Sequence, residues 1–424
     1  MIKLLFLLPF PPRLDATHGG GKAIAQLLFR LATRHRLAVV YMRGRAEPPL
    51  DERLRDRFDL VKEVERPWTR RSVGSQWGRI AVSLMRQKPM WVTAWTSDAY
   101  AAAVESAVKS WQPDVVHIAY HVMGQYLSTL GDCKAPRVLT EHEPANRAVP
   151  HVRSLSGIAR LLNHYDRQAW KRFEPAVISQ VQAVVVFTET DRQAIKTLVP
   201  GALVVTIPLG TEIPETPLDP LGCTPPNLLF FGNFIHPPNA DAALRTVRTI
   251  FPPLEARFPD LELYMVGDKP PAELRRLAND KIRVTGCVPD LVPYVNRASI
   301  FIAPLRVGGG MRLKILEALA AGKAIVASPR AVEGLDVVNG QTVCIAESDA
   351  EFCAAITELL SHPEKRLSLA SEARAWACAN LGWDKSVVAY QTLHAGLIEN
   401  FQQPPASLAK RRPECHSMSR ETLL

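Results

Sequence analysis

Three consecutive glycines, Gly308 to Gly310, stand directly before a helix-like run with Arg312 and Lys314 in its first turn. A helix N-terminus carries partial positive charge, so cations are unfavourable there unless an anion is bound. Glycines let a ligand approach the backbone closely, and N–H groups at a helix N-terminus bind phosphate. The pattern therefore predicts an anion site, and a diphosphate would account for both cations through charge-assisted hydrogen bonds.

Glu317 lies about one turn further along the same run. A carboxylate at this distance can accept hydrogen bonds from both hydroxyls of a ribose, so loop and helix together predict a nucleotide site. The alternative is a flexible turn with Lys314 paired to Glu317 on the solvent face. Such a pair stabilises a helix by only about 0.2–0.5 kcal/mol, and it does not explain why three glycines precede the helix.

A second glycine cluster includes Gly20 and Gly21 and precedes Lys22. It does not fit a phosphate-loop NTPase, because Ala16 replaces the first glycine and Ala23 replaces the magnesium-binding Ser or Thr. Neither glycine cluster has the spacing of a dinucleotide-binding fingerprint, which counts against a simple NAD enzyme.

Polar side chains also follow two buried runs in the first half of the chain. His121 comes just after residues 114–119, and Glu141 and His142 follow residues 137–140. Ligands of open α/β sheets bind at the carboxyl ends of strands, so we select these three side chains as candidates for catalysis. The alternative for the second group is an exposed polar loop, and we expect His117 to be a core residue.

The elements that must position these residues are short apolar runs that alternate with helical patterns. Runs that are apolar throughout indicate parallel strands covered on both faces, and the alternation predicts doubly wound α/β domains. We expect strands at residues 3–8, 37–42, 114–119, 137–140, 183–187, 203–207, 227–232, 261–267, 282–286, 299–304 and 324–328.

A proline-rich stretch, residues 208–226, interrupts this alternation and predicts a linker that acts as a hinge. We therefore expect two Rossmann-like domains that face each other across a ligand-binding cleft. The predicted division is residues 1–207, an N-terminal Rossmann-like domain; 208–226, the linker; 227–382, a C-terminal Rossmann-like domain that holds the predicted nucleotide site; 383–401, a helix that returns to the first domain; and 402–424, a disordered basic tail.

Composition limits the class of protein. The chain has 424 residues and a net charge of +9, which suits two globular domains and anionic partners. Seven scattered cysteines without metal spacing are expected to be free thiols.

The start reads as a buried strand rather than a signal peptide, and no run approaches the ~20 apolar residues of a membrane span. We predict a cytoplasmic protein, peripheral at the inner face of the plasma membrane.

Residues 66–97 contain six cations and four tryptophans but no Asp or Glu. Basic groups with interfacial aromatics suit an anionic membrane surface. The alternative is a helix packed on the first domain with solvated cations. We do not expect nucleic-acid binding, because no recognition module accompanies this stretch.

The chain resembles family 4 nucleotide-sugar-dependent glycosyltransferases of the two-Rossmann-domain GT-B architecture, from residue 1 to about 400, and within them the exopolysaccharide-associated sugar transferases of the cell envelope. The resemblance is carried by "HGGGKA" (18–23), "DVVHIAYH" (114–121), "LTEHEP" (139–144), "FFGNFIHPPN" (230–239), "MVGD" (265–268), "VTGCVPDLVPYV" (284–295) and "PLRVGGGMRLKILEALAAGKAIVAS" with "EGL" (304–335).

The resemblance implies transfer of a sugar from a UDP- or GDP-sugar, with retention and with no required metal or cofactor. It implies that Gly20 and Gly21 shape the cleft floor, that Asn233 lies on a phosphate-side loop, and that the backbone from Val288 to Asp290 faces the base. Glu317 matches the second of two family glutamates. The first falls on Gly309, so a carboxylate that relatives use to hold the donor sugar is missing.

The resulting hypothesis is a hexosyltransferase that adds a sugar to a polysaccharide, glycolipid or lipid-linked acceptor. In this hypothesis residues 1–207 bind the acceptor and residues 227–382 bind the nucleotide sugar. One alternative is a nucleotide-sugar 2-epimerase, which would need acid and base groups around the sugar. Another is a donor-binding partner subunit without activity, which Gly309 motivates. The sequence names neither the sugar nor the acceptor.

Overall fold

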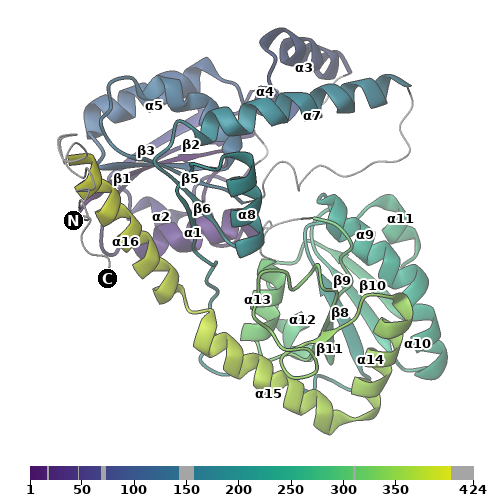
Figure 1. The fold of residues 1–424 in the computed structure, drawn as a ribbon. Coiled ribbons are helices and arrows are strands. Elements are labelled where there is room, and N and C mark those ends of the chain that lie inside the picture. Colours follow the sequence, from purple (N-terminus) through teal and green to yellow (C-terminus); the bar gives the residue numbers. More distant parts are fainter. Residues whose placement is uncertain (17–18, 46, 68–72, 143–156, 309–311, 403–424) are drawn as a thin grey trace, which may run out of the picture.

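A computed structural model describes the chain except for residues 17–18, 46, 68–72, 143–156, 309–311 and 403–424. Figure 1 shows two parallel sheets, each covered by helices on both faces. The strand order is β3-β2-β1-β4-β5-β6-β7 in the first sheet and β10-β9-β8-β11-β12-β13 in the second. This is the predicted arrangement of two doubly wound domains. Gly309, Gly310 and the predicted disordered tail lie outside the described residues.

The strands of the first sheet follow the apolar runs of the first half. The central strand β1 is buried throughout apart from its first residue, and β4 is buried along its whole length. Their bounds are β1 Lys3–Leu8, β2 Arg36–Arg43, β3 Leu60–Glu65, β4 Val115–Ala119, β5 Arg137–Thr140, β6 Ala183–Val186 and β7 Val204–Thr206.

Two groups of helices cover the first sheet. Alternate residues of β1 pack on opposite faces: Leu4 and Phe6 against α1 and the C-terminal helix α16, Leu5 and Leu7 against α5 and α7. The helices of this half are α1 Gly19–Leu31, α2 Glu52–Arg55, α3 Val73–Arg86, α4 Met90–Ala94, α5 Asp98–Trp111, the 3-10 segment η1 His121–Leu130, α7 Gly157–Ile178 and α8 Glu189–Leu198.

The second sheet has its own large core. Its strands are β8 Asn227–Phe231, β9 Glu262–Val266, β10 Ile282–Gly286, β11 Ile300–Ala303, β12 Ile325–Ala327 and β13 Cys344–Ile345. Its helices are α9 Pro237–Arg245, η2 Thr246–Ile250, α10 Phe251–Arg257, α11 Ala272–Arg276, α12 Val292–Arg297, α13 Leu313–Ala320, α14 Asp349–Ser361 and α15 Pro363–Asn380, and α16 Trp383–Gln402 follows.

Two strands, β3 and β13, were not among the predicted runs. Both lie at a sheet edge, where a strand is less covered than at the centre. The half-buried β3 sequence LVKEVE therefore alternates with charged residues instead of being apolar throughout, so it does not stand out as an apolar run.

Two chain segments cross between the sheets side by side. The Thr211 N–H donates to the Leu381 carbonyl at 2.8 Å, and Thr211 forms a parallel bridge with Gly382. Further along the linker, Arg374 binds the Pro214 carbonyl and Lys323 binds the Asp219 carbonyl. The linker is thus fastened to the second domain from about residue 214. After the crossing, α16 returns to the first sheet (Figure 1).

Candidate donor-binding cleft

A cleft of about 780 Å3 lies between the carboxyl ends of the two sheets. The first domain contributes the segment after β1, the start of α1, Tyr120 after β4, and the tryptophans Trp91 and Trp95. The second domain contributes the segments after β8, β9 and β10 and the first turns of α13. Ligands of open α/β sheets bind at this position, because the loops after parallel strands converge there.

Seven of the residues selected from the sequence line this cleft: Gly20, Asn233, Val288, Asp290, Arg312, Lys314 and Glu317. Gly21 is buried in the first turn of α1, next to this lining. Gly308 has φ of +105°, a conformation that side chains rarely adopt, and packs beside Pro238. Residues from both halves of the chain are thereby brought to one cavity.

Lys314 is positioned by the second sheet. Its Nζ donates to Asn239 Oδ1 at 2.6 Å and lies 4.3 Å from the Phe230 ring centroid. Burial, reinforced by the neighbouring Arg312 and only partly offset by Glu317, lowers the pKa of Lys314 to about 7. A bound anion would favour the charged form of this amine, so Lys314 suits a phosphate ligand.

Gly232 is the reason that Lys314 can occupy this position. A Cβ on Gly232 would lie 2.7 Å from Lys314 Nζ and 3.0 Å from Asn239 Nδ2. Any side chain at residue 232 would therefore displace the amine or its partner. Arg312, the N-cap residue of α13, lines the same cleft as Lys314, so both cations stand at the start of the helix.

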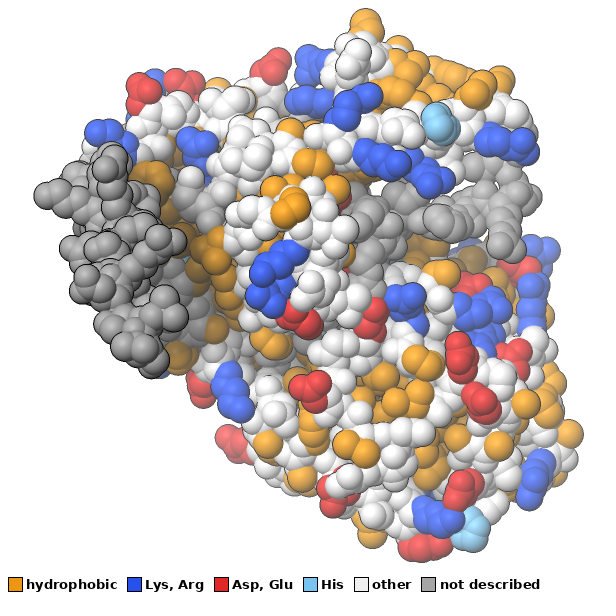
Figure 2. All heavy atoms as spheres, in the orientation of Figure 1, with side chains coloured by type: hydrophobic (Ala, Val, Ile, Leu, Met, Phe, Trp, Pro, Cys, Tyr) orange, Lys and Arg blue, Asp and Glu red, His pale blue; other side chains and the backbone are white. Residues whose placement is uncertain are grey.

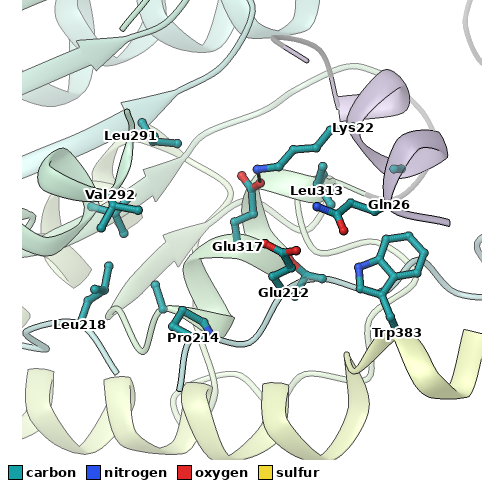
Figure 3. Close-up of a pocket in the computed structure, with 15 residues that line it drawn as sticks. Lys22, Gln26, Glu212, Pro214, Leu218, Leu291, Val292, Leu313, Glu317 and Trp383 are labelled. Carbon is teal, nitrogen blue, oxygen red and sulfur yellow. Dashed lines mark hydrogen bonds and ion pairs between the residues drawn. The ribbon is translucent and has the colours of Figure 1, made fainter. Parts of the chain in front are cut away.

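Glu317 forms an ion pair with Lys22 of α1, and Figure 3 shows the two side chains meeting between the domains. The side chains are 22% and 36% exposed. Glu317 therefore pairs with Lys22, and Lys314 pairs with Asn239. The alternative, in which Lys314 pairs with Glu317 on the solvent face, is not what the structure shows. Lys22 was not predicted as a site residue, although its position directly after the glycine cluster indicates that it lies at the same end of the sheet.

A smaller cavity of about 150 Å3 lies behind this ion pair. Figure 3 shows Leu218, Pro214 and Trp383 around it, with Lys22 and Glu317 at one end. It is lined by α1, α13, the linker and the start of α16. This places Glu317 between the main cleft and the segments that cross between the domains.

His121 and Glu141 lie behind the wall of the cleft rather than on it. His121 Nδ1 is 2.6 Å from Glu141 Oε2, and each side chain is only 1% exposed. The Trp91 ring stands edge-on to His121 with centroids 5.3 Å apart, and Trp91 lines the cleft. The geometry does not place these two predicted residues in contact with the cavity; it places them beneath Trp91.

His142 is closer to the cavity. Its ring stacks on Tyr120, with centroids 4.0 Å apart and an interplanar angle of 11°. A Cβ on Gly20 would lie 1.9 Å from Tyr120 Oη and 3.5 Å from His142 Nδ1, so only glycine fits at residue 20. Tyr120 was missed by the sequence analysis, although it directly follows a predicted strand.

One group of side chains in the described part of the chain could hold a metal ion. His121, Glu141 and Glu174 are buried, and their ligating atoms lie within 4.8 Å of one another. An imidazole with two carboxylates suits a divalent cation. Glu174 comes from α7, far along the chain, and had no recognisable spacing to the other two.

Residues 225–362 match the family model described as glycosyl transferases group 1. The match covers the second sheet and the side chains around Lys314. A segment of 137 residues is 34% identical to a phosphatidyl-myo-inositol mannosyltransferase of Mycolicibacterium smegmatis, and one of 135 residues is 30% identical to an uncharacterised glycosyltransferase of Methanocaldococcus jannaschii. These alignments cover 30% of this chain and span only about a third, 35% and 34%, of the relatives' lengths.

Solved structures resemble nearly the whole chain. Sucrose-phosphate synthase from Thermosynechococcus elongatus superposes with a TM-score of 0.69 at 17% identity, over 94% of this chain and all of that one. HepE of Anabaena in complex with UDP-glucose gives a TM-score of 0.64 at 14% identity, over 94% of this chain and 100% of HepE. WaaG, a glycosyltransferase involved in lipopolysaccharide biosynthesis, gives 0.63 at 14% identity, over 92% and 99%. The chain has the GT-B fold, as the sequence predicted.

Proposed function

We propose that this protein is a retaining glycosyltransferase that moves a sugar from a UDP- or GDP-sugar to a polysaccharide, glycolipid or lipid-linked acceptor. The observation that carries the proposal is the cleft wall formed by α13, where Arg312 and Lys314 flank the helix N-terminus and Glu317 stands one turn further on. The group 1 match over residues 225–362 and the UDP-glucose complex of HepE support it.

In this proposal the donor lies along α13. The diphosphate takes the helix N-terminus, Arg312 and Lys314, because cations and N–H groups together stabilise its charge. The ribose hydroxyls donate to Glu317, and the base lies against the backbone from Val288 to Asp290. Asn233, on the segment after β8, faces the diphosphate from the side, and Gly20 with Gly21 lets the first domain approach it closely.

Donor binding changes the partner of Lys22. In the structure the Lys22 ammonium pairs with the Glu317 carboxylate, which would also have to bind the ribose. The nucleotide therefore competes with an ion pair that joins the two domains, and the released ammonium lies in the same cleft as the phosphates. Closure about the linker at residues 208–226 would then exclude water from the donor.

The transfer step needs little acid–base chemistry from the protein. The acceptor oxygen forms a bond to the anomeric carbon on the face that the phosphate leaves, and the acceptor proton passes to a departing phosphate oxygen. Stabilising that phosphate is then the main catalytic task of Arg312 and Lys314. His142, stacked on Tyr120 at the cleft, is the proposed group for orienting the sugar or acceptor.

His121 and Glu141 have a supporting role in this scheme. Their hydrogen bond lies under Trp91, so they fix the ring that forms part of the acceptor side. No cofactor or metal ion is required in the proposed reaction, since the diphosphate charge is met by the two cations and the helix.

Two alternatives compete with sugar transfer. A nucleotide-sugar 2-epimerase would use the same donor site, and Gly309 at the first-glutamate position motivates a partner subunit without activity. The match to group 1 glycosyl transferases favours transfer over both. Epimer formation without acceptor would support the first alternative, and donor binding without turnover over a broad acceptor panel would support the second.

The test is a thermal-shift screen with UDP, GDP, ADP, TDP and their sugars, followed by transfer assays with the sugar nucleotide that binds. Bound ligand raises the melting temperature by mass action. We expect one nucleotide to be selected, with the shift lost in Glu317→Ala and Lys314→Ala and kept in the exposed control Glu364→Ala. The proposal fails if no nucleotide shifts the melting temperature of the unmodified protein.

A further inference from the structure

Two helices of the first domain, α3 and α7, expose large hydrophobic side chains. Trp77, Leu84 and Met85 of α3 are 56%, 45% and 76% exposed, and Ile158 and Leu161 of α7 are 66% and 71% exposed. We call these five side chains the crest. Figure 1 shows α3 lying along α7 at the outer edge of the domain, and Figure 2 shows hydrophobic side chains gathered there.

The crest is held by specific contacts and is not a loose segment. The Tyr165 hydroxyl of α7 donates to the Ser83 carbonyl at 2.5 Å, and the Lys88 carbonyl oxygen lies 3.1 Å from the same hydroxyl. The Met90 N–H donates to Asp166 Oδ1 at 2.7 Å. The turn between α3 and α4 is therefore fastened to α7, so the two helices that carry the five apolar side chains are tied together at this turn.

In the described parts of α3 and α7, the exposed charged side chains are cations and the acids are not exposed. Residues 73–97 contain no Asp or Glu, and the exposed side chains of α3 and α7 include Arg86, Arg167, Lys171 and Arg172. The two acids of α7 point inward: Asp166 binds the Met90 N–H, and Glu174 is 3% exposed. Figure 2 shows Lys and Arg side chains below the hydrophobic atoms.

We propose that the crest inserts into the surface of a membrane that contains anionic phospholipids. Apolar side chains at the tip with cations behind them match the acyl boundary and the headgroup layer of such a membrane. Among the described residues, none of the helices has the length and hydropathy of a membrane span. The cations select the anionic lipid as the partner.

The position of the crest suggests what the membrane contact does for the reaction, and this step rests on the proposed function. Helix α4 follows α3 directly, and its Trp91, with the adjacent Trp95, lines the donor cleft. A membrane held at the crest would thus lie beside the acceptor side of the cleft. The acceptor that fits this geometry has a lipid anchor in the same leaflet and a sugar or phosphate head that reaches past Trp91.

Vesicle flotation with the full-length protein tests the proposal. We expect binding to phosphatidylcholine vesicles that contain phosphatidylglycerol, weakening at high salt, and no binding to phosphatidylcholine alone. The double variant Met85→Ser with Leu161→Ser should bind at least about tenfold more weakly, because two apolar insertions are lost. The matched control is Val338→Ser with Leu367→Ser, two exposed positions of the second domain that are 54% and 43% exposed.

Three results of this experiment would overturn the proposal that the crest binds a membrane. The proposal is overturned if the unmodified protein ignores anionic vesicles, or if the crest variant binds them as well as the control does. It is also overturned if light scattering shows a dimer without lipid that the crest variant turns into a monomer, since the face would then bind a second copy. Nucleotide-induced thermal shifts, measured in parallel on all variants, report the donor site separately from membrane binding.

Discussion

The Lys22 ammonium and the Glu317 carboxylate form an ion pair that joins the two domains across the proposed donor cleft. The two residues are 295 positions apart in the chain. One lies in the first turn of α1 and the other in the middle of α13. The pair means that the carboxylate assigned to the ribose is already occupied before a nucleotide arrives.

Lys22→Met should increase the affinity for a nucleoside that lacks phosphate. Such a ligand no longer competes with the ammonium for Glu317, and a part-exposed pair contributes about 0.2–1 kcal/mol, so the gain is about 1.4- to 5-fold. Calorimetric titration with the free nucleoside of the selected base measures it. Lys62→Met, which removes an exposed lysine bonded to Ser106, is the control. An unchanged or lower nucleoside affinity in Lys22→Met would refute the competition.

Binding of a nucleotide sugar should weaken as the pH rises above about 7. Lys314 is then neutral in the free protein, because burial lowers its pKa to about 7, and the bound diphosphate must recharge it by taking up a proton. The affinity for the nucleotide sugar should fall by at most about tenfold per pH unit. A nucleotide sugar is the right probe, since its diphosphate has no titrating group in this range.

Calorimetry in two buffers of different ionisation enthalpy detects the proton uptake. Lys314→Met should bind more weakly and show no uptake. The same lowered pKa means that the folded protein binds fewer protons than the unfolded chain between about pH 7 and 10.5, so Lys314 makes stability rise with pH over that window. Identical proton uptake in the variant would assign the titration to another group.

Gly232→Ala should damage donor binding without a large effect on folding. The new Cβ would lie 2.7 Å from Lys314 Nζ, and the end of a lysine moves at little cost, so the diphosphate loses a well-placed cation. We expect about a tenfold loss of affinity, because one charge-assisted hydrogen bond contributes about 1.5 kcal/mol or more. Gly201→Ala, where a Cβ meets nothing within 4 Å, is the control. Equal affinities for both variants would show that Lys314 does not contact the donor.

The contact between α16 and the first sheet should weaken in acid. His117 Nε2 and His394 Nε2 are 2.5 Å apart and buried. Burial lowers the pKa of His394 from 6.5 to about 3 and also lowers that of His117. The unfolded chain therefore binds more protons below pH 6.5, and the free energy of unfolding falls as the pH drops from there toward 3.

Urea unfolding followed by tryptophan fluorescence at several pH values measures this loss. His394→Gln should reduce the pH dependence by up to about 1.4 kcal/mol per pH unit, whereas the exposed His164→Gln should leave it unchanged. A pH dependence that is the same in both variants would mean that the buried pair does not control acid stability.

Chelation should leave sugar transfer unchanged if the cations of α13 carry the phosphate charge. The measurement is the transfer rate before and after EDTA treatment, with total metal determined on the same sample. The opposite outcome is a required metal ion bound by His121, Glu141 and Glu174. A loss of rate that a divalent ion restores, and that Glu174→Gln reproduces, would place a required metal in that group.

The sequence alone determined the two parallel sheets and the local parts of the site. Buried central strands are apolar throughout, so their runs could be read directly, and the glycine loop, Lys314 and Glu317 lie within one strand–loop–helix unit whose spacing is local. Tertiary structure alone decided the rest: that Lys22 meets Glu317, that His121 lies behind Trp91, and that Ile158 and Leu161 of α7 are exposed like Trp77, Leu84 and Met85 of α3. The physical reason is that these contacts join residues from different elements. Their relative positions depend on how sheets and helices pack, and spacing along the chain does not encode this.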